Sequence, residues 1–400
     1  MIYICTCLLY IITHIQLYFL RWKAFRTVPL PQQIQDFSEK ISIIIPSFNQ
    51  AEDLQELIPQ LLEQDYPGGF EIIVVIHGSK DNTMDILQFY ESTYRNIRHT
   101  SIPKSAHFID FQKLAINIGI KAARTEWLII ASPKMRPQGS AWLQALTKGI
   151  TTDCDLIFGY ANYTLTNQAT HPFQYETHIN YVENIACLLQ NKSPHSIGLN
   201  CAFKKKALNL DKLYPPSSIK YTIGGFSLLI NQIAQHGTVK FTTDTDAIVS
   251  INTDKETLSE IERARIVEKL FIATSSKTHR LKDIYTFSTL ILLYLGSVIG
   301  VLPLIPLINS NFQSDIIVSL PLLSTYEISP ETLVIISILS FIIYIISLLL
   351  PIKWVVRNIK HFNIKLPLFY HLVLPIALPI LNIYKRTSVF FKEKSYRRRM

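Results

Sequence analysis

The sequence predicts an α/β protein with a mostly parallel sheet, helices on both faces of that sheet, and transmembrane helices at both ends of the chain. Between about residues 40 and 275, short β-branched or aromatic runs alternate with segments of helical periodicity, an alternation that is typical of parallel sheets. The 400-residue chain is 48% hydrophobic and only 17% charged, and the apolar excess lies at its two ends. We therefore expect a membrane protein with a soluble middle.

Residues 1–26 are predicted to form an N-terminal membrane anchor. Ile2 to Leu20 is apolar apart from a few threonines, His14 and Gln16, and three basic residues follow it. A cleaved signal peptide carries its positive charge before the apolar run and a small-residue cleavage site after it, and this segment has neither. Because the run is partly polar, it either spans the membrane or lies along its surface.

Two transmembrane helices are predicted at residues 284–308 and 333–352. Both runs lack charged residues, and about 20 apolar residues suffice to cross a bilayer. The loop between them, 309–332, carries three acidic residues and no Lys or Arg, whereas basic residues flank the outer ends of both runs. The positive-inside rule therefore predicts that the middle domain and the C-terminus are cytoplasmic.

The C-terminal region is predicted to contact the membrane surface. Residues 366–384 are apolar but contain three prolines and have basic residues at both ends, which favours an interfacial or re-entrant segment. The basic tail, residues 385–400, holds seven Lys or Arg and one Glu, and so carries +6 of the net charge of +9. Such a tail suits nucleic acid or anionic lipid. Because it directly follows a hydrophobic stretch, we expect membrane lipid and no nucleic acid as its partner.

The middle of the chain, residues 40–282, is predicted to fold as one cytoplasmic domain. Leucine and isoleucine recur at helical spacing between Leu54 and Leu62, and Asp81 is placed to cap a helix that begins near Asn82. Ligands of parallel sheets bind beyond the carboxyl ends of the strands. Four runs have the composition of buried strands: 41–45, 71–76, 127–131 and 155–160. The loops at that edge of the sheet are 46–49, 77–81 and 132–137.

The order of several motifs resembles the family 2 glycosyltransferases. Ile41 to Asn49, Glu71 to Thr83 and Lys113 to Ala123 match the opening blocks, and Trp142-Leu143 and Glu262 to Arg265 continue the match. The later blocks are similar to a membrane-anchored bacterial branch of the family. The resemblance implies a GT-A fold, a nucleotide-sugar donor and usually Mg²⁺ or Mn²⁺. It also implies a nucleotide-sugar site at the following positions: Pro46, Ser47, Asn49, His77, Ser79, Asp81, Lys113, Asn117, Ser132 and Lys134.

The chain departs from the family pattern at positions that carry chemistry. Ser132 and Lys134 stand where the family has two metal-binding aspartates. Ile76 and His77 stand where it has aspartates of which one binds the nucleoside. Residues 224–227, Gly-Gly-Phe-Ser, align with the aspartate run that supplies the base in the family, so the catalytic residue is unknown from the sequence. Mg²⁺ requires carboxylate oxygens, and we therefore predict no metal cofactor. Lys134 could offset phosphate charge directly.

Other charged residues have competing interpretations. Asp153 and Asp155, and likewise Asp244 and Asp246, match a two-aspartate metal pattern by letters alone. The first pair opens a predicted buried strand and the second precedes one, so we expect both to be structural. Arg263 and Arg265 lie on a predicted helix of residues 255–273. These arginines face lipid phosphate, an acidic partner or the donor diphosphate, and the membrane surface is favoured.

Three functions are consistent with the sequence. The first is a glycosyltransferase in the bacterial inner (cytoplasmic) membrane that transfers sugar from a nucleotide-sugar donor to a cell-surface polysaccharide or glycolipid precursor. The second is a catalytically inactive relative that binds nucleotide sugar, glycan, or a partner glycosyltransferase of the polysaccharide machinery. The third is a membrane scaffold. Five cysteines at no metal-ligand spacing fit a reducing compartment.

Overall fold

The structure is a computed structural model, and the chain divides into two compact units. One unit contains the hairpin of β11 (Ile317–Leu320) and β12 (Leu323–Glu327), and the other contains every other described helix and strand. We describe each unit by itself. The residues described are 37–102, 111–165, 171–189, 193–194, 197–208, 225–253, 317–320, 323–327 and 335.

The main sheet has seven strands in the order β3-β2-β1-β4-β8-β6-β9. All neighbouring pairs are parallel except the two that involve β8, which runs antiparallel to β4 and to β6. The prediction of a mostly parallel sheet is confirmed. The strands are β1 (Ile41–Ser47), β2 (Phe70–His77), β3 (Ile97–Ile102), β4 (Trp127–Ile130), β6 (Leu156–Phe158), β8 (Cys201–Lys204) and β9 (Val239–Phe241).

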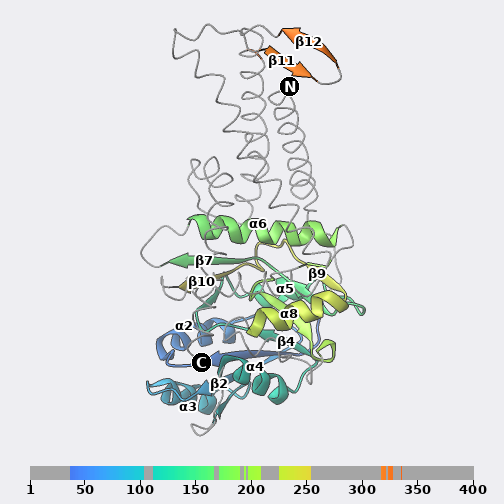
Figure 1. The fold of residues 1–400 in the computed structure, drawn as a ribbon. Helices are drawn as coiled ribbons and strands as arrows, with labels where there is room; N and C mark the ends of the chain where they lie inside the picture. The colour runs from blue at the N-terminus through green and yellow to red at the C-terminus, as the bar shows by residue number, and fades with distance from the viewer. Residues whose placement is uncertain are drawn as a thin grey trace. The chain divides into compact units, whose positions relative to one another are not determined.

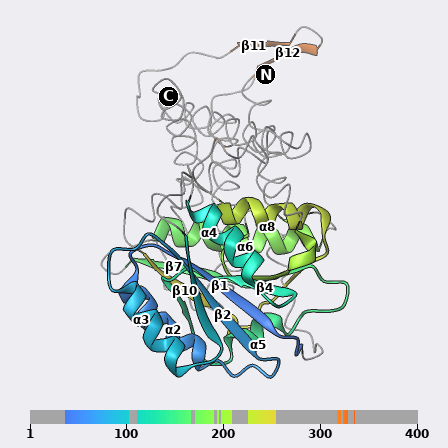
Figure 2. The same ribbon diagram turned by 90° about the horizontal axis from the view of Figure 1, so that it is seen from below.

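Helices cover both faces of this sheet, as predicted (Figure 2). Alternate residues of β1, starting at Ile41, join a core cluster with the apolar side chains of α2 (Ala51–Leu62). α3 (Thr83–Thr93) packs beside α2. On the other face, α4 (Phe111–Ala122) crosses β1 and β2, and α8 (Gly225–His236) contacts α4.

Gly119 permits the close approach of α4 to the sheet. A Cβ atom at this position would lie 2.3 Å from Cγ2 of Ile44 and 3.3 Å from Cγ2 of Val75. Real Cβ atoms do not approach other atoms so closely, because interiors are already packed to crystal-like density. The glycine therefore sets the distance between this helix and the strands beneath it.

A second, three-stranded sheet extends the domain (Figure 1). Its central strand β10 (Val249–Thr253) runs antiparallel to β5 (Met135–Pro137) and parallel to β7 (Ala161–Leu165). The longest described helix, α6 (His171–Leu188), contacts β7, and the short α5 (Trp142–Thr147) contacts β6 and β8. A 3₁₀ turn, η1, spans Lys205–Ala207.

The predicted membrane segments lie almost wholly outside the described residues. This holds for residues 1–26, 284–308, 366–384 and the tail 385–400, and for 333–352 apart from residue 335. Among the helices that the structure describes, none combines the length and the apolar character needed to cross a bilayer. The antiparallel hairpin β11–β12 falls inside the predicted external loop 309–332.

Candidate functional site

The loops that follow β1 and β2 are joined by hydrogen bonds at the carboxyl edge of the sheet. The backbone N–H of Asn49 donates to Oγ of Ser79 (3.0 Å), and the N–H of Lys80 donates to Oδ1 of Asn49 (2.8 Å). The N–H of Ala51, the first residue of α2, donates to Oδ2 of Asp81 (2.9 Å). We call these five residues the loop clasp. Three predicted site residues, Asn49, Ser79 and Asp81, are thus brought together, and the side chain of each accepts a hydrogen bond from a backbone N–H of the neighbouring segment.

Asp81 caps a helix, as predicted, and it also ties that helix to α2. Its Oδ1 accepts hydrogen bonds from the hydroxyl (2.6 Å) and the N–H (3.3 Å) of Thr83, the first residue of α3. Asn82 holds the N-cap position but makes no capping bond with its side chain. Although partial burial alone would raise the pKa of the Asp81 carboxyl, the hydrogen bonds from Thr83 and Ala51 lower it below its usual value.

An aromatic pair stands beside the loop clasp. The rings of Phe48 and His77 lie 5.3 Å apart at an interplanar angle of 32°, and Phe48 is 53% exposed. Burial lowers the pKa of His77, which favours the neutral ring near pH 7. We did not predict a role for Phe48. Its place between Ser47 and Asn49, in a loop at the sheet edge, is the signal that could have indicated one.

The end of β1 also carries a buried hydroxyl. Ser47 is 3% exposed, and its Oγ has no hydrogen-bond partner among the described residues. A buried polar atom without a partner is costly unless a ligand or a water molecule satisfies it. Ser47 is therefore suited to contact a polar ligand. Pro46, which precedes it, is only partly buried.

Lys113 and Asn117 lie on α4, which runs antiparallel to β1. The segment after α4 is fixed at the amino end of the sheet, because Thr125 and Ser42 share a hydrogen bond of 2.7 Å between their hydroxyls. The start of α4 therefore lies toward the carboxyl edge. Lys113 is 7% exposed, and Oδ1 of Asn117 is buried without a hydrogen-bond partner in the part of the chain that the structure describes.

The loop after β4 is held by local bonds and by β10. The N–H of Lys134 donates to Oγ of Ser132 (3.3 Å), and the carbonyl of Lys134 accepts from the N–H of Asn252 (3.0 Å). Burial raises the pKa of the Asp53 carboxyl, while the charges of Lys134 and Arg136 act in the opposite direction. The charge of Lys134 therefore acts on a carboxylate of α2.

Arg136 anchors this loop to α2, a contact that we did not predict. Its guanidinium donates to Oε2 of Glu56 at 2.6 and 3.1 Å and lies 3.7 Å from Oδ1 of Asp53. It also donates to the carbonyls of Pro133 (2.7 Å) and Met135 (2.9 Å). Arg136 is 8% exposed, and removing a partner from such a buried charge is strongly destabilising. The sequence signal was an arginine two residues after Lys134.

The donor atoms of this loop do not suit a divalent metal. Mg²⁺ and Mn²⁺ prefer carboxylate and other oxygen ligands, whereas this loop presents the Ser132 hydroxyl and the Lys134 cation. Asp53 and Glu56, the nearest carboxylates from α2, face the Arg136 guanidinium. Within the described ranges, no three His, Cys, Asp or Glu side chains form a group able to hold a metal ion.

The remaining acidic pairs have structural partners. Oδ2 of Asp155 accepts from the N–H of Thr238 (2.9 Å), and Oδ1 of Asp153 lies 3.8 Å from Nζ of Lys240. Oδ1 of Asp244 accepts from the N–H of Asp246 (3.0 Å), which closes a turn. Arg263, Arg265 and Gly224 fall outside the described residues, while Gly225, Phe226 and Ser227 form the first turn of α8.

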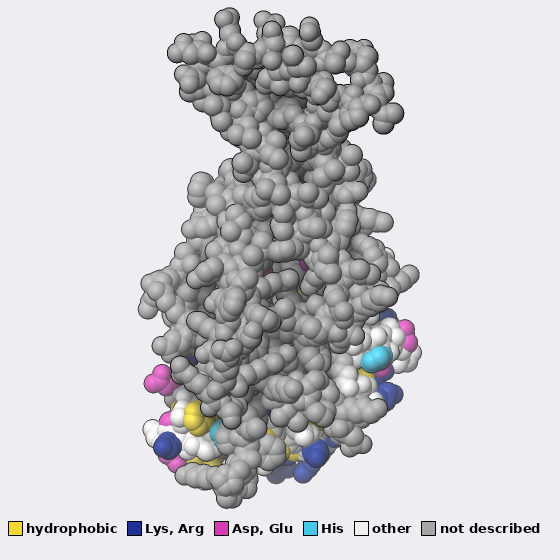
Figure 3. Space-filling view, viewed as in Figure 1, with side chains coloured by type: hydrophobic (Ala, Val, Ile, Leu, Met, Phe, Trp, Pro, Cys, Tyr) yellow, Lys and Arg dark blue, Asp and Glu magenta, His cyan; other side chains and the backbone are white. Residues whose placement is uncertain are grey.

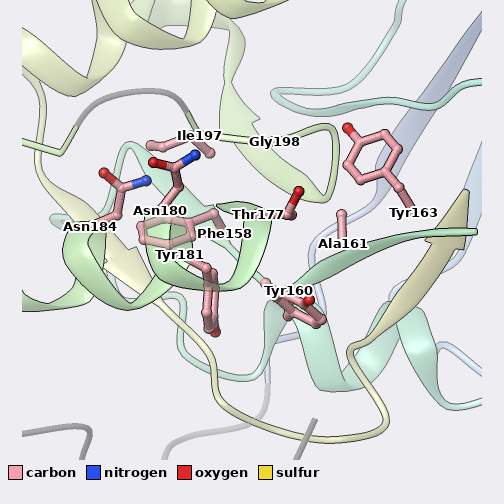
Figure 4. Close-up of a pocket in the computed structure, with 11 residues that line it drawn as sticks. Phe158, Tyr160, Ala161, Tyr163, Thr177, Asn180, Tyr181, Asn184, Ile197 and Gly198 are labelled. Carbon is pink, nitrogen blue, oxygen red and sulfur yellow. The ribbon is translucent and has the colours of Figure 1, made fainter. Parts of the chain in front are cut away.

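A pocket that we did not predict lies between β6, β7 and α6 (Figure 4). Phe158, Tyr160 and Tyr181 contribute aromatic rings, and Asn180 and Asn184 contribute amides. The signal in the sequence was weak, because the asparagines are scattered along an ordinary helical segment. Only the fold places them against the end of β6.

Comparison with known proteins gives a match for the part of the chain that carries these loops. Residues 42–210 match the model of Glycosyl transferase family 2. The match supports a family 2 glycosyltransferase domain. It covers the loop clasp and the loop after β4, and ends near η1.

Two curated relatives align with part of this chain. Glycosyltransferase AglE of Haloferax volcanii is 28% identical over 142 residues, which is 35% of this chain and 45% of that protein. Chondroitin synthase of Pasteurella multocida is 27% identical over 161 residues, 36% of this chain and 16% of that protein. The chain thus matches less than half of the length of these relatives.

A solved structure shares the fold. Mannosyltransferase PcManGT of Pyrobaculum calidifontis, in complex with GDP-Man and Mn²⁺, is similar with a TM-score of 0.53 and 16% sequence identity. The likeness covers 87% of this chain and 98% of that one. At this identity the likeness shows a GT-A-like mixed α/β fold.

Proposed function

We propose that this protein is a membrane-anchored, family 2 glycosyltransferase-like protein that binds a nucleotide sugar at the carboxyl edge of its main sheet. It transfers the sugar to a cell-surface polysaccharide or glycolipid precursor at the cytoplasmic face of a bacterial inner membrane. One observation carries the proposal. The loops after β1, β2 and β4 all leave the same edge of a parallel sheet, where such sheets bind their ligands.

The residues at that edge suit the parts of a nucleotide sugar. The exposed Phe48 ring and the neutral His77 ring form a surface on which a base can stack. Ser47 and Asn117 offer buried polar atoms to a polar ligand. Lys134 supplies positive charge where the family pattern has a metal, and a lysine neutralises phosphate as a point charge. Because the donor atoms do not suit a metal, no step is assigned to one.

A second candidate is a relative that binds the donor without turnover. It is favoured by the first turn of α8, where Gly225, Phe226 and Ser227 provide no carboxylate to deprotonate an acceptor hydroxyl. A general base typically contributes about 10²–10⁴-fold to the rate. In this case the protein serves a partner glycosyltransferase or the machinery of polysaccharide synthesis.

Calorimetry on the purified full-length protein tests the proposal. UDP- and GDP-sugars are titrated in EDTA and again in Mn²⁺. In parallel, the release of free nucleoside diphosphate (UDP or GDP) is measured in the presence of membrane lipid. We expect binding of one nucleotide class with equal affinity in EDTA and in Mn²⁺. Release of the diphosphate separates an enzyme from a binding protein. If no nucleotide sugar binds, the protein is a scaffold and the proposal is wrong.

A further inference from the structure

One guanidinium holds the backbone on both sides of Lys134. Nη1 of Arg136 donates to the carbonyls of Pro133 (2.7 Å) and Met135 (2.9 Å), the residues directly before and after that lysine. The N–H of Lys134 donates to the hydroxyl of Ser132, and its carbonyl accepts from β10. Because the planar peptide groups on both sides of Lys134 are held in place, its backbone angles are fixed, and so is the direction in which its side chain leaves the loop.

The other side of the guanidinium reaches α2. Nε and Nη2 of Arg136 donate to Oε2 of Glu56 at 3.1 and 2.6 Å, and Nη2 lies 3.7 Å from Oδ1 of Asp53. The side chain of Arg136 is 10% exposed, while that of Glu56 is 66% exposed. A planar guanidinium presents donors in several fixed directions at once, whereas a lysine ammonium is a single point charge. Arg136 therefore joins the loop after β4 to α2 in a way that a lysine could not.

α2 is also the helix that the loop clasp holds. The N–H of Ala51, the first residue of α2, donates to Asp81 of the clasp, and Glu56 lies five positions further along the same helix. The loops after β1, β2 and β4 are thus connected through α2 by hydrogen bonds. These bonds are made by the protein itself, so a ligand meets a site that is already ordered, which favours binding.

The charges around Arg136 separate two explanations of its role. Asp53 and Glu56 bring two negative charges to the guanidinium. If this cluster served only through its charge, removing the Glu56 carboxylate would leave the site more positive and would strengthen the binding of an anion. If Glu56 serves to hold Arg136, and Arg136 to hold the loop, the same change weakens binding. The two explanations therefore predict opposite signs for one substitution.

We propose that Arg136 is a positioning residue for the diphosphate of the donor, which acts through Lys134 and is anchored by Glu56. This role rests on the proposed function, because the nucleotide donor is what brings a diphosphate to this edge of the sheet. It adds a division of labour to that function. Arg136 orders the loop after β4 without contacting the ligand, and Lys134 meets the phosphates.

The test measures what the second phosphate adds to nucleotide affinity. UMP and UDP, and likewise GMP and GDP, are titrated by calorimetry into the full-length protein, and the Kd of each monophosphate is divided by that of its diphosphate. Glu56→Ala removes the anchor at an exposed position, and Arg136→Lys keeps the charge without the planar group. Glu52→Ala is the matched control, since Glu52 is an exposed carboxylate of the same helix. Thermal unfolding checks that each variant is folded.

We expect Glu56→Ala to lower this Kd ratio about threefold or more, since an affinity falls in proportion to the fraction of molecules whose loop has the binding geometry. Arg136→Lys should lower the ratio at least as much, and Glu52→Ala should leave it unchanged. The monophosphates should bind all variants equally, because the loops that meet the base are intact. In a Lys134→Ala background, neither Glu56→Ala nor Arg136→Lys should lower the ratio further. If Arg136→Lys unfolds, the Glu56→Ala result decides.

A second readout needs no nucleotide. The N–H groups of Lys134 and Met135 are bonded to Ser132, and hydrogen exchange of the peptide that contains them reports how well the loop is ordered. We expect faster exchange in Glu56→Ala and in Arg136→Lys than in the natural protein. Glu52→Ala should exchange at the natural rate.

Two results would overturn the proposal: both variants keep the full Kd ratio, or their loss persists undiminished in the Lys134→Ala background. If nucleotides bind the natural protein normally in either case, the proposed donor site stands and only the positioning role is lost. If the natural protein binds no nucleotide at all, the proposed function fails and the positioning role fails with it, whatever the exchange rates are.

Discussion

Lys134 shows how one side chain changes the chemistry of the loop after β4. It stands in a loop whose backbone is fixed by Ser132 and by Asn252 of β10. Its charge acts to lower the pKa of the Asp53 carboxyl, which burial raises. The residue is therefore held at the carboxyl edge of the sheet, where we propose that the donor binds. A lysine in this position suits an anion and repels a divalent metal.

The substitution Lys134→Ala should weaken nucleotide-sugar binding by about 1.5–3 kcal/mol, the range for a hydrogen bond to a charged group. Binding by the natural protein should also weaken as salt is added, because charges near a surface are screened over about 8 Å at physiological ionic strength. Calorimetry at two salt concentrations measures both effects. Lys148→Ala, at an exposed position after α5, is the control and should change neither the affinity nor its salt dependence. Equal losses of affinity in the Lys134 and Lys148 variants would show that Lys134 does not contact the phosphates.

The hydrogen bonds of Asp81 lead to a second measurable prediction. Its carboxylate joins the first turns of α2 and α3, and loss of a helix cap costs about 0.5–2 kcal/mol. We expect Asp81→Ala to lower the free energy of unfolding by about 2 kcal/mol, the upper part of that range, since two helices are affected. Urea denaturation measures this, with the exposed Asp65→Ala as control. A drop in nucleotide affinity beyond the loss of stability would instead assign Asp81 to the ligand.

The contribution of Asp81 to the free energy of unfolding should depend on pH in a defined direction. Its folded-state pKa is lowered, so the stability it contributes is fully present above the ordinary aspartate pKa of about 3.9. That stability is lost as pH falls through the lower folded-state value. The difference between the natural protein and Asp81→Ala should be constant from neutral pH to about pH 5 and shrink below about pH 4. A difference that grows in acid would contradict the hydrogen-bonded carboxylate.

Among the elements, α4 owes its position on the sheet to Gly119. The added methyl group of Gly119→Ala would lie 2.3 Å from Ile44 Cγ2, and overpacking typically costs about 1–3 kcal/mol. We expect Gly119→Ala to destabilise the protein by that amount in thermal or urea unfolding. Gly139→Ala is the control, since a Cβ there meets nothing within 4 Å. Combining Gly119→Ala with Ile44→Ala should be less harmful than the sum of the two; strict additivity would argue against the contact.

Long, uniformly apolar strands were the elements easiest to predict. β1, β2 and β4 coincide with predicted runs to within about two residues, since a strand buried on both faces requires a continuous apolar sequence. β6 is shorter than predicted: its ladder with β8 ends at Phe158, and a Cβ at Gly159 would lie 2.8 Å from Nδ2 of Asn200. β3, β7 and β8 were not predicted, and β5 and β9 were missed as well. Each of the last two has three residues, too few for a period of two to be recognised.

At the scale of the whole molecule, charge is distributed unevenly along the chain. Basic and acidic side chains are interspersed on the described surface that is visible in Figure 3, while the last sixteen residues hold +6 of the net +9. This distribution supports the proposal that the tail meets an anionic membrane surface. The net charge of the chain therefore reflects its tail more than its α/β domain.

Membrane topology gives the last prediction. If the positive-inside rule holds, a single cysteine placed at Ser314 in a cysteine-free background should react with an impermeant reagent added to intact cells. A cysteine placed at Ser395 should not react until the cells are opened. The measurement is the extent of labelling before and after lysis. Labelling of Ser395→Cys from outside would reverse the proposed orientation.

The sequence by itself determined the α/β class, the parallel strands with helices on both faces, and the polar loops at one sheet edge. These features follow from local periodicity and from the rule that parallel strands share a carboxyl edge. The tertiary structure alone decided what each polar group does. It bound Asn49 and Asp81 into the loop clasp, paired Arg136 with Glu56 across 80 positions, and set the asparagines of α6 against β6. Such contacts join residues far apart in the chain, and no local pattern encodes them, because each depends on how separate elements pack together.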